Sequence, residues 1–304
     1  MSGGILKRVL KYVEITTKIT SLLAFLMGLA FLYNAEQKIN WGLTLLFFTG
    51  MFLFDLTTTA INNYIDTKTN HQIIPLPRKA ALAILLCLLT VSAACGLYLA
   101  YLTDAVVLCT GVLCFLCGIF YTWGPVPISR LPLGEVFSGF FYGLVIPFIL
   151  LYINMPAGTF LELSGGGGEI KMTLQLLPLT VLLLLSTAPV CTTANIMLAN
   201  NICDVEHDVQ VKRYTLAYYL GKKWSLRVFS CCYYAIYCVQ MLMILLGIFS
   251  PLFLLFFITI VPVEKNIGRF RQVQCKETTF LCSIKNYLII MGADVLLIFL
   301  EGIL

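Results

Sequence analysis

Nine apolar stretches restrict what this 304-residue chain can fold into more than any other feature. Most are near the ~20 residues that a helix needs to cross the ~30 Å hydrocarbon core of a bilayer. A helix also satisfies its own backbone hydrogen bonds where no water is present. Charged residues make up only 12% of the chain, which leaves too little polar sequence for a separate soluble domain. We therefore predict an all-α, polytopic membrane protein with one transmembrane domain over residues 1–304. The predicted spans are residues 16–33, 41–61, 80–101, 105–121, 134–153, 173–200, 226–247, 250–263 and 280–301.

Basic residues predict the orientation of these spans. Of the 20 Lys and Arg residues, all except Lys38 and Lys171 fall on one side of the predicted arrangement. Cytoplasmic loops are enriched in Lys and Arg, so we expect the N-terminus and this whole side to be cytoplasmic. The net charge of +5 indicates weak attraction to anionic lipid headgroups. Nucleic acid is not an expected partner, because the chain has no basic face with interleaved aromatic residues. On the other side, the glycines at 165–168 predict a flexible linker.

Two polar clusters stand where predicted helices reach the cytoplasmic side. The first polar cluster contains Asn62 and Asp66, and the second contains Asn201, Asp204 and Asp208. Residues one helical turn apart share a side of the helix, so each cluster presents several oxygen atoms in one direction. Carboxylates are unfavourable near hydrocarbon and therefore indicate a functional site. Mg²⁺ takes one or two carboxylates from a protein and completes its shell with water and phosphate oxygens. The two clusters predict a divided Mg²⁺ site acting on a phosphate-bearing lipid, with Asp66, Asp204 and Asp208 as its catalytic acids. The alternative is a pair of solvated helix ends, which one cluster alone would fit better than two.

Basic residues follow each polar cluster along the chain. Metal ions and basic side chains together neutralise the charge that develops on a leaving diphosphate. We expect this role for Lys68, Arg78, Lys79, Lys212 and Arg213. The alternative is that the lysines only anchor the chain at lipid headgroups.

A turn-rich connection, residues 121–135, offers a third set of candidates. Its prolines and glycines end one helix before the next begins. Aromatic faces stabilise cations, which is useful if an allylic carbocation forms. The candidates for an acceptor or carbocation pocket are Asp55, Tyr121, Trp123, Glu135 and Phe141. The aromatic residues are equally consistent with packing or an interfacial belt, and Glu135 with the positive end of a helix dipole.

The pattern Asn62-x-x-x-Asp66, combined with the second polar cluster, resembles the UbiA superfamily of intramembrane prenyltransferases. Residues 121–135, 200–217 and 283–286 are most similar to its menaquinone branch, the 1,4-dihydroxy-2-naphthoate polyprenyltransferases. The resemblance implies nine helices around a central cavity open to the cytoplasm, in the cell membrane. It also implies a polyprenyl diphosphate donor and transfer to the aromatic acceptor, with diphosphate, CO₂ and demethylmenaquinone as products. The metal ligands implied for Mg²⁺ are Asn62, Asp66, Asn201, Asp204 and Asp208.

The first polar cluster departs from the family pattern, which usually reads Asn-Asp-x-x-Asp-x-x-x-Asp. Asn63 and Asn70 stand in place of two of these aspartates, so we expect weaker binding or fewer direct ligands. Asp55 lies on the same side of the helix and is a candidate to compensate. Two alternatives stay open: another acceptor such as 4-hydroxybenzoate or haem, and an ion-coupled transporter. Transporter sites usually lie near the midplane, whereas these acids lie at one rim.

Overall fold

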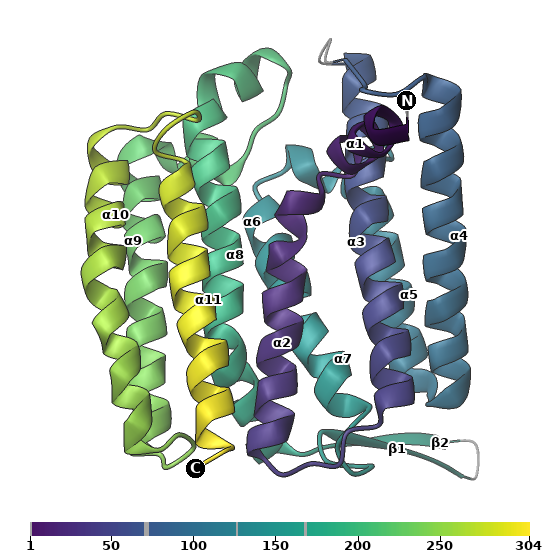
Figure 1. Cartoon of the computed structure of the whole chain (residues 1–304), viewed down its shortest axis with the longest axis vertical. Helices are drawn as coiled ribbons and strands as arrows, with labels where there is room; N and C mark the ends of the chain where they lie inside the picture. The colour runs from purple at the N-terminus through teal and green to yellow at the C-terminus, as the bar shows by residue number, and fades with distance from the viewer. Residues whose placement is uncertain (1, 70–72, 126, 167–168) are drawn as a thin grey trace. The chain divides into compact units, whose positions relative to one another are not determined.

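The computed structural model describes residues 2–69, 73–125, 127–166 and 169–304, and helices dominate it (Figure 1). The chain forms two compact units. Unit 1 comprises Met1–Leu22, Trp41–Gly134 and Val205–Tyr219, and unit 2 comprises Leu23–Asn40, Glu135–Asp204 and Leu220–Leu304.

Eight helical segments of the described residues are long and apolar enough to cross a membrane. They are Ile15–Asn34, Trp41–Thr67, Arg78–Leu102, Gly134–Tyr152, Leu176–Gln210, Leu216–Leu245, Pro251–Gln272 and Leu281–Glu301. Each corresponds to one predicted span, which confirms the all-α membrane class. The remaining predicted span forms helix α5, Ala105–Phe120, whose 16 residues extend only about 24 Å. The predicted count of nine is therefore not confirmed.

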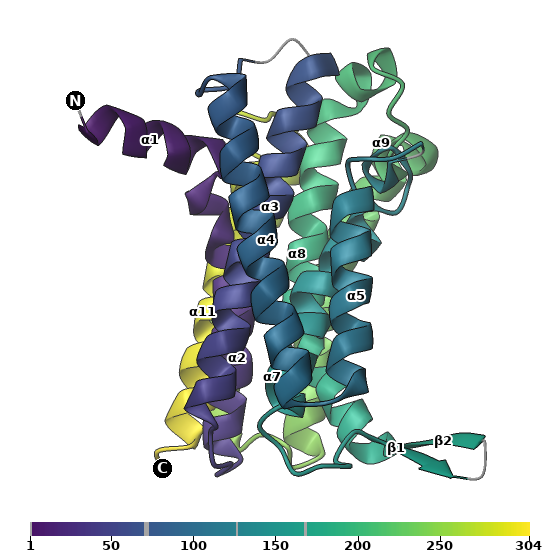
Figure 2. The ribbon, with the colours of Figure 1, turned by 90° about the vertical axis from the view of Figure 1, so that its right-hand side faces the viewer.

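Unit 1 is built around helices α3 (Trp41–Thr69), α4 (Arg78–Leu102) and α5, which lie side by side (Figures 1 and 2). It also contains α1 (Ser2–Tyr12), η1 (Ile15–Lys18) and the short η2 (Ile128–Arg130). Tyr12 at the end of α1 is fully buried in an apolar cluster with Leu56, Ala60 and Ala81. Figure 2 shows α1 running crosswise to α3 and α4. The basic helix α1 is thus attached to the bundle by its last turn.

Unit 2 contains the last three spans and the helices on either side of a short hairpin. Its elements are α6 (Gly134–Ser138), η3 (Gly139–Val145), α7 (Ile146–Tyr152), β1 (Leu161–Gly166), β2 (Glu169–Leu174), most of α8 (Leu176–Gln210) and α9 (Leu216–Leu245), η4 (Pro251–Thr259), α10 (Ile260–Gln272) and α11 (Leu281–Glu301). Helix α2 (Ile19–Asn34) begins in unit 1 and continues into unit 2, and α8 ends in unit 1.

A π-helical stretch, η3, interrupts the span formed by α6 and α7. At this stretch Gly143 packs against α8 so closely that an added Cβ would lie 2.3 Å from the backbone nitrogen of Val190. Only glycine fits at such a distance. Single-turn π-helices are frequent at functional sites, and this one carries Phe141, a predicted pocket residue.

The glycine-rich stretch is not the linker that we predicted. Strands β1 and β2 pair antiparallel, with Leu161 opposite Leu174 and Leu163 opposite Met172. Gly165 and Gly166 belong to β1, whereas positions 167 and 168 lie outside the described residues. Alternating apolar and polar residues beside the glycines favour paired strands, and glycine does not prevent an extended backbone.

Candidate functional site

The first polar cluster lies in the last turns of α3. Asn62 and Asp66 are one helical turn apart, and the hydroxyl of buried Thr122 donates a hydrogen bond to Asn62 Oδ1. This bond joins the polar cluster to the turn-rich connection that follows α5. Sequence reasoning missed Thr122, whose only signal was its position between Tyr121 and Trp123.

Unit 1 brings the end of the second polar cluster to the first. Asp208 Oδ1 lies 3.7 Å from the guanidinium of Arg213, and the charges of Arg213 and Arg130 both act on the carboxylate of Asp66. Arg213 is also held in place, because its Nε donates to the carbonyl oxygen of Ser129 at 2.8 Å. Charges interact more strongly in such a partly buried position than in open water. We call Asp66, Arg130, Asp208 and Arg213 the Arg213 cluster.

Arg130 was not among the predicted site residues. It is the only basic residue of the turn-rich connection, and this was the available signal. Its backbone also contributes, because the amide of Tyr214 donates to the Arg130 carbonyl oxygen at 3.1 Å. The segment after α8 and the turn-rich connection are therefore joined by backbone as well as side-chain bonds.

The end of α8 explains why Arg213 lies beside Asp208. The amide of Arg213 donates to the Asp208 carbonyl oxygen at 2.8 Å, and the amide of Lys212 donates to the Val209 carbonyl oxygen at 3.1 Å. These two bonds define a Schellman motif, which needs a left-handed residue at the position of Lys212. Lys212 has a φ of 57°, a conformation that is unfavourable by about 1 kcal/mol for a residue other than glycine. The turn reverses the chain and returns Arg213 toward the helix end.

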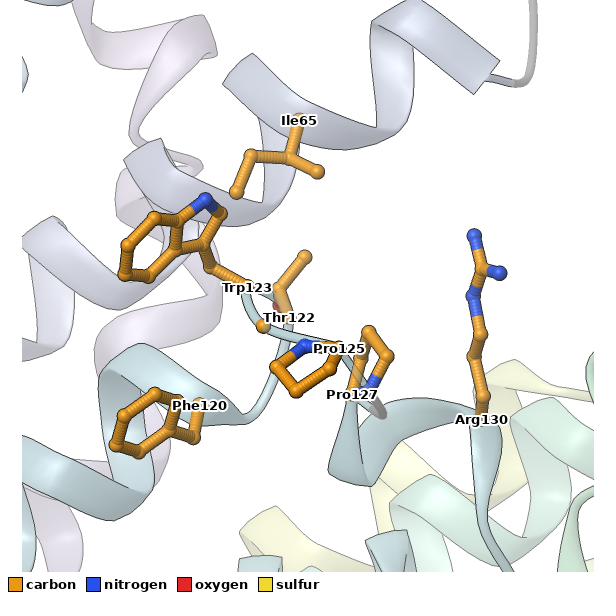
Figure 3. Close-up of a pocket in the computed structure, with 8 residues that line it drawn as sticks. Ile65, Phe120, Thr122, Trp123, Pro125, Pro127 and Arg130 are labelled. Carbon is orange, nitrogen blue, oxygen red and sulfur yellow. The ribbon is translucent and has the colours of Figure 1, made fainter.

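A pocket of about 480 Å³ opens beside the first polar cluster, within unit 1 (Figure 3). Its lining residues are Ile65, Phe120, Thr122, Trp123, Gly124, Pro125, Pro127 and Arg130. The lining is mostly apolar, and Arg130 stands on the opposite side from Trp123 (Figure 3). Of the predicted acceptor-pocket residues, Trp123 lines this pocket, and its role toward an acceptor stays a prediction. The backbone oxygen of Tyr121 accepts from the amide of Ser129 at 2.8 Å, which closes the loop that carries this wall.

Asn201 and Glu135 form a buried pair in unit 2. Asn201 Nδ2 donates to Glu135 Oε1 at 2.8 Å, and the residues are 1% and 4% exposed. Glu135 Oε2 and Asn201 Oδ1 have no hydrogen-bond partner among the residues that the structure describes. A buried polar atom without a partner is unfavourable by about 1–3 kcal/mol, so such atoms mark a place where a ligand would be stabilised. Glu135 orients the Asn201 amide so that its oxygen is the atom left available.

Asp204, also in unit 2, forms an ion pair with a lysine from a distant part of the chain. Lys276 Nζ contacts Asp204 Oδ2 from the loop between α10 and α11. Lys276 was not predicted as a site residue, because the sequence shows only that it is a basic residue in a loop between two spans. Asp204 and Asp208 lie on the same continuous helix, one turn apart.

Phe141 belongs to an aromatic group in unit 2. Its ring centroid lies 5.2 Å from that of Phe140 and 5.9 Å from that of Phe137. Such pairs contribute packing energy, and their faces also present negative charge density to a cation.

Asp55 lies deeper in unit 1, in a buried charge pair. Its Oδ1 accepts from Lys18 Nζ at 2.8 Å, and its Oδ2 accepts from the Ser21 hydroxyl at 2.6 Å. Lys18 Nζ also donates to the hydroxyl of Thr59 at 2.5 Å. This network ties η1 and α2 to α3, at a position about two helical turns before Asn62.

The side-chain amide of Asn63 holds two structural partners. Its Nδ2 donates to the Tyr12 carbonyl oxygen at 2.8 Å and to Glu14 Oε1 at 3.1 Å. The Tyr12 hydroxyl donates to the carbonyl oxygen of Ala60 at 2.9 Å, and burial raises the pKa of Tyr12 to about 12. An amide at position 63 can donate both bonds, whereas an aspartate can donate neither.

The remaining predicted diphosphate ligands lie at the start of α4 or near it. The guanidinium of Arg78 donates to the Tyr64 carbonyl oxygen at 3.1 Å and stacks 4.9 Å from the centre of the Tyr64 ring. Lys79 is exposed in the first turn of α4. The side chain of Lys68 and the whole of Asn70 lie outside the described residues.

Within each unit, the polar cluster residues offer amide and carboxylate oxygens, the atoms that Mg²⁺ binds when it is shared with a phosphate. Among the described residues, no three His, Cys, Asp or Glu side chains converge on one point. A metal held here therefore relies on amide oxygens, single carboxylates, water and substrate oxygens, which is the usual coordination of Mg²⁺. The buried, unpartnered oxygen of Asn201 is the atom that fits this role best.

Residues 21–271 match the UbiA prenyltransferase family, and the chain belongs to this family. More particularly, a stretch of 152 residues is 30% identical to 1,4-dihydroxy-2-naphthoate octaprenyltransferase of Bacillus subtilis (strain 168). That match covers 50% of this chain and 42% of the relative's length.

Solved structures of the family share this fold. A UbiA homolog from Aeropyrum pernix K1 in its apo form has a TM-score of 0.66 at 15% identity, covering 92% of this chain and 97% of that one. A UbiA homolog from Archaeoglobus fulgidus bound to GPP and Mg²⁺ has a TM-score of 0.64 at 13% identity, covering 98% and 100%. At these identities the likeness concerns the fold alone.

Proposed function

We propose that this protein transfers a polyprenyl group from polyprenyl diphosphate to 1,4-dihydroxy-2-naphthoate, in a Mg²⁺-dependent reaction. The products are demethylmenaquinone, diphosphate and CO₂. The observation that carries the proposal is the Arg213 cluster: Arg213 lies 3.7 Å from Asp208 of the second polar cluster, and the charges of Arg213 and Arg130 act on Asp66 of the first. The B. subtilis relative supports the acceptor, and the A. fulgidus structure with GPP and Mg²⁺ supports the donor and the metal.

We assign the metal to the two polar clusters. Asn62, Asp66, Asn201, Asp204 and Asp208 would hold it, and Mg²⁺ bound there would neutralise charge on the diphosphate oxygens. Glu135 accepts from the Asn201 amide nitrogen and leaves the Asn201 oxygen available, whereas the Thr122 hydroxyl donates to the Asn62 amide oxygen itself.

Basic side chains bind the diphosphate as it leaves. The allylic C–O bond breaks, its electron pair stays on the diphosphate oxygen, and an allylic cation remains. Lys212 and Arg213 follow α8 in the chain, and Arg78 and Lys79 lie in the first turn of α4. Lys68 is assigned to this role from the sequence alone. Removing one preorganised donor of this kind typically lowers kcat by about 10²–10³-fold.

The acceptor binds beside these charges in an apolar, aromatic environment that excludes water. Trp123 lines its pocket. We assign Tyr121, Phe141, Glu135 and Asp55 to the environment in which the cation forms. The electron-rich ring attacks the cation at the carbon that carries the carboxylate. That carboxylate then leaves as CO₂, and the electrons of its C–C bond return to the ring.

We place both polar clusters and the N-terminus on the cytoplasmic side of the cell membrane, in one domain that spans the chain. The support is the concentration of Lys and Arg in loops of one side. The donor's polyprenyl tail then stays in the bilayer while its diphosphate reaches the aqueous rim.

A radiolabelled transfer assay tests the proposal. Purified protein receives labelled polyprenyl diphosphate with 1,4-dihydroxy-2-naphthoate, 4-hydroxybenzoate or haem, with Mg²⁺ or with a chelator. We expect labelled product and pyrophosphate with the naphthoate and Mg²⁺ only, and no transfer by folded Asp66→Ala or Asp208→Ala. Transfer to another acceptor contradicts the naphthoate assignment. No Mg²⁺-dependent pyrophosphate release with any acceptor contradicts prenyl transfer and favours a transporter.

A further inference from the structure

A loop between two membrane spans delivers a lysine to the second polar cluster. Residues 273–280 connect α10 to α11, and Lys276 at the tip of this loop contacts Asp204 Oδ2. The Lys276 side chain is 49% exposed and that of Asp204 19% exposed, so the pair lies at the rim in contact with water. Both residues belong to unit 2, and neither is part of the Arg213 cluster.

The loop holds its shape without help from Asp204. The amide of Cys275 donates to the Thr279 hydroxyl at 2.8 Å, and the amides of Thr279 and Phe280 both donate to the Cys275 carbonyl oxygen at 3.0 Å. Gln274 anchors the loop to the end of α10, since its side-chain amide donates to the Phe270 carbonyl oxygen at 2.5 Å. Lys276 therefore projects from a closed turn fixed at both ends by membrane helices.

A metal ion and an ammonium cannot share Asp204 Oδ2. Mg²⁺ binds oxygen at about 2.0–2.1 Å and an ammonium binds it at about 2.7–2.9 Å, so two cations on one oxygen would repel strongly. Lysine is a compact charge on a flexible stem, which lets it change partner while its backbone stays fixed. When a metal takes Asp204, Lys276 leaves this carboxylate but stays beside it, because the loop is anchored.

We propose that Lys276 is a tethered counter-ion for the metal site. It neutralises Asp204 before the metal binds, and after displacement its ammonium binds the diphosphate of the prenyl donor. The inference rests on the proposed function, because it takes Asp204 as a metal ligand and a prenyl diphosphate as the donor. It adds to the predicted diphosphate ligands a residue from the loop between α10 and α11.

Metal binding without donor tests the first half. Free Mn²⁺ is measured by electron paramagnetic resonance during titration of the purified full-length protein, its Lys276→Gln variant and the matched control Lys265→Gln. Lys265 is exposed on α10 and its substitution makes the same change of charge. We expect Lys276→Gln to bind Mn²⁺ about two- to fivefold more tightly, the range of a partly exposed ion pair. The control should match the wild type. Unchanged or weaker binding by Lys276→Gln overturns the proposal.

Donor binding tests the second half. With Mg²⁺ present, Lys276→Gln should bind GPP about tenfold more weakly, the loss of one charge-assisted hydrogen bond. Lys276→Arg should recover most of the wild-type affinity, and Lys265→Gln should keep it. Equal GPP affinity in wild type and Lys276→Gln overturns the proposal.

An Asp204→Asn variant distinguishes this inference from the proposed function. If wild type binds Mn²⁺ and Asp204→Asn binds it much more weakly, the metal site stands, and an unchanged Lys276→Gln then refutes only the counter-ion role. If Asp204→Asn binds Mn²⁺ as wild type does, the metal assignment of Asp204 fails and the counter-ion role fails with it.

Discussion

Replacing Asn63 by aspartate would restore the residue that the family pattern has at this position, yet we expect it to harm the protein. The amide of Asn63 donates to the Tyr12 carbonyl oxygen at 2.8 Å and to Glu14 Oε1 at 3.1 Å. Aspartate loses both bonds and places a second negative charge beside Glu14. One neutral bond is worth about 1 kcal/mol and one bond to a charged group about 1.5–3 kcal/mol. We expect the attachment of α1 to weaken by about 3 kcal/mol.

Hydrogen exchange measured by mass spectrometry reports how firmly α1 is held, from the exchange rates of its own backbone amides. Amides at the end of α1, around buried Tyr12, should exchange about 100-fold faster in Asn63→Asp, because 1.4 kcal/mol corresponds to a factor of ten. Helix α5 serves as an internal reference, because none of the bonds of Asn63 described above involves this helix. The double variant Asn63→Asp/Glu14→Gln is the matched control, since glutamine removes the repulsion and can donate to the new carboxylate. It should recover part of the protection.

Two results would refute this reasoning. If exchange around Tyr12 stays at the wild-type rate in Asn63→Asp, the amide does not hold α1. If the variant binds Mn²⁺ more tightly while α1 stays protected, position 63 faces the metal, as the family pattern implies.

Three further predictions concern the charges of unit 1. Asp55→Asn should lower the free energy of unfolding by about 3–5 kcal/mol, because the variant leaves the buried ammonium of Lys18 without its carboxylate. Chemical denaturation in detergent measures this loss, and the double variant Lys18→Met/Asp55→Asn should recover most of the lost stability. Full stability of Asp55→Asn would contradict a buried charge pair. Arg213→Lys should keep the positive charge but lose the planar guanidinium that contacts Asp208 and Ser129. We therefore expect kcat for prenyl transfer to fall about 10²-fold. An unchanged kcat would show that the geometry of Arg213 is unimportant. Lys212→Gly should raise the thermal midpoint slightly or leave it unchanged, because glycine accepts a φ of 57°; a clear loss of stability would contradict the assigned helix end.

The sequence was sufficient to predict the membrane class and eight of the spans, because apolar length is a property of each segment alone. It also predicted helix α5 to within one residue, but this helix is too short to count as a span by itself, so the number of nine spans is not confirmed. The sequence failed at the glycine stretch, where pairing between β1 and β2 depends on residues that lie on either side of the glycines.

The candidate site was predictable where residues lie on one helix. The spacing of Asn62 and Asp66 on α3, and of Asp204 and Asp208 on α8, follows from the helical period. Partners from other elements were not predictable, because no local pattern marks them. Thr122, Arg130 and Lys276 reach the polar clusters only through the tertiary fold.

The same limit applies to residues whose role is structural. Asn63 looks like a weakened metal ligand in the sequence, but its amide holds α1. Asp55 shares a side of α3 with Asn62, and the structure shows its carboxylate bound to Lys18 and Ser21. Whether Asp55 also influences the acceptor stays a prediction.

The most direct test of the central claim is a double-mutant cycle on Asp66 and Asp208, read as GPP affinity in the presence of Mg²⁺ by isothermal titration calorimetry. If both carboxylates hold one magnesium–diphosphate complex, either Asp66→Asn or Asp208→Asn alone should remove most of the Mg²⁺-dependent affinity, and the double variant should be little worse than either. Independent sites predict the opposite, since the two losses in binding free energy would then add within about 0.5 kcal/mol. Such additivity would contradict a shared site.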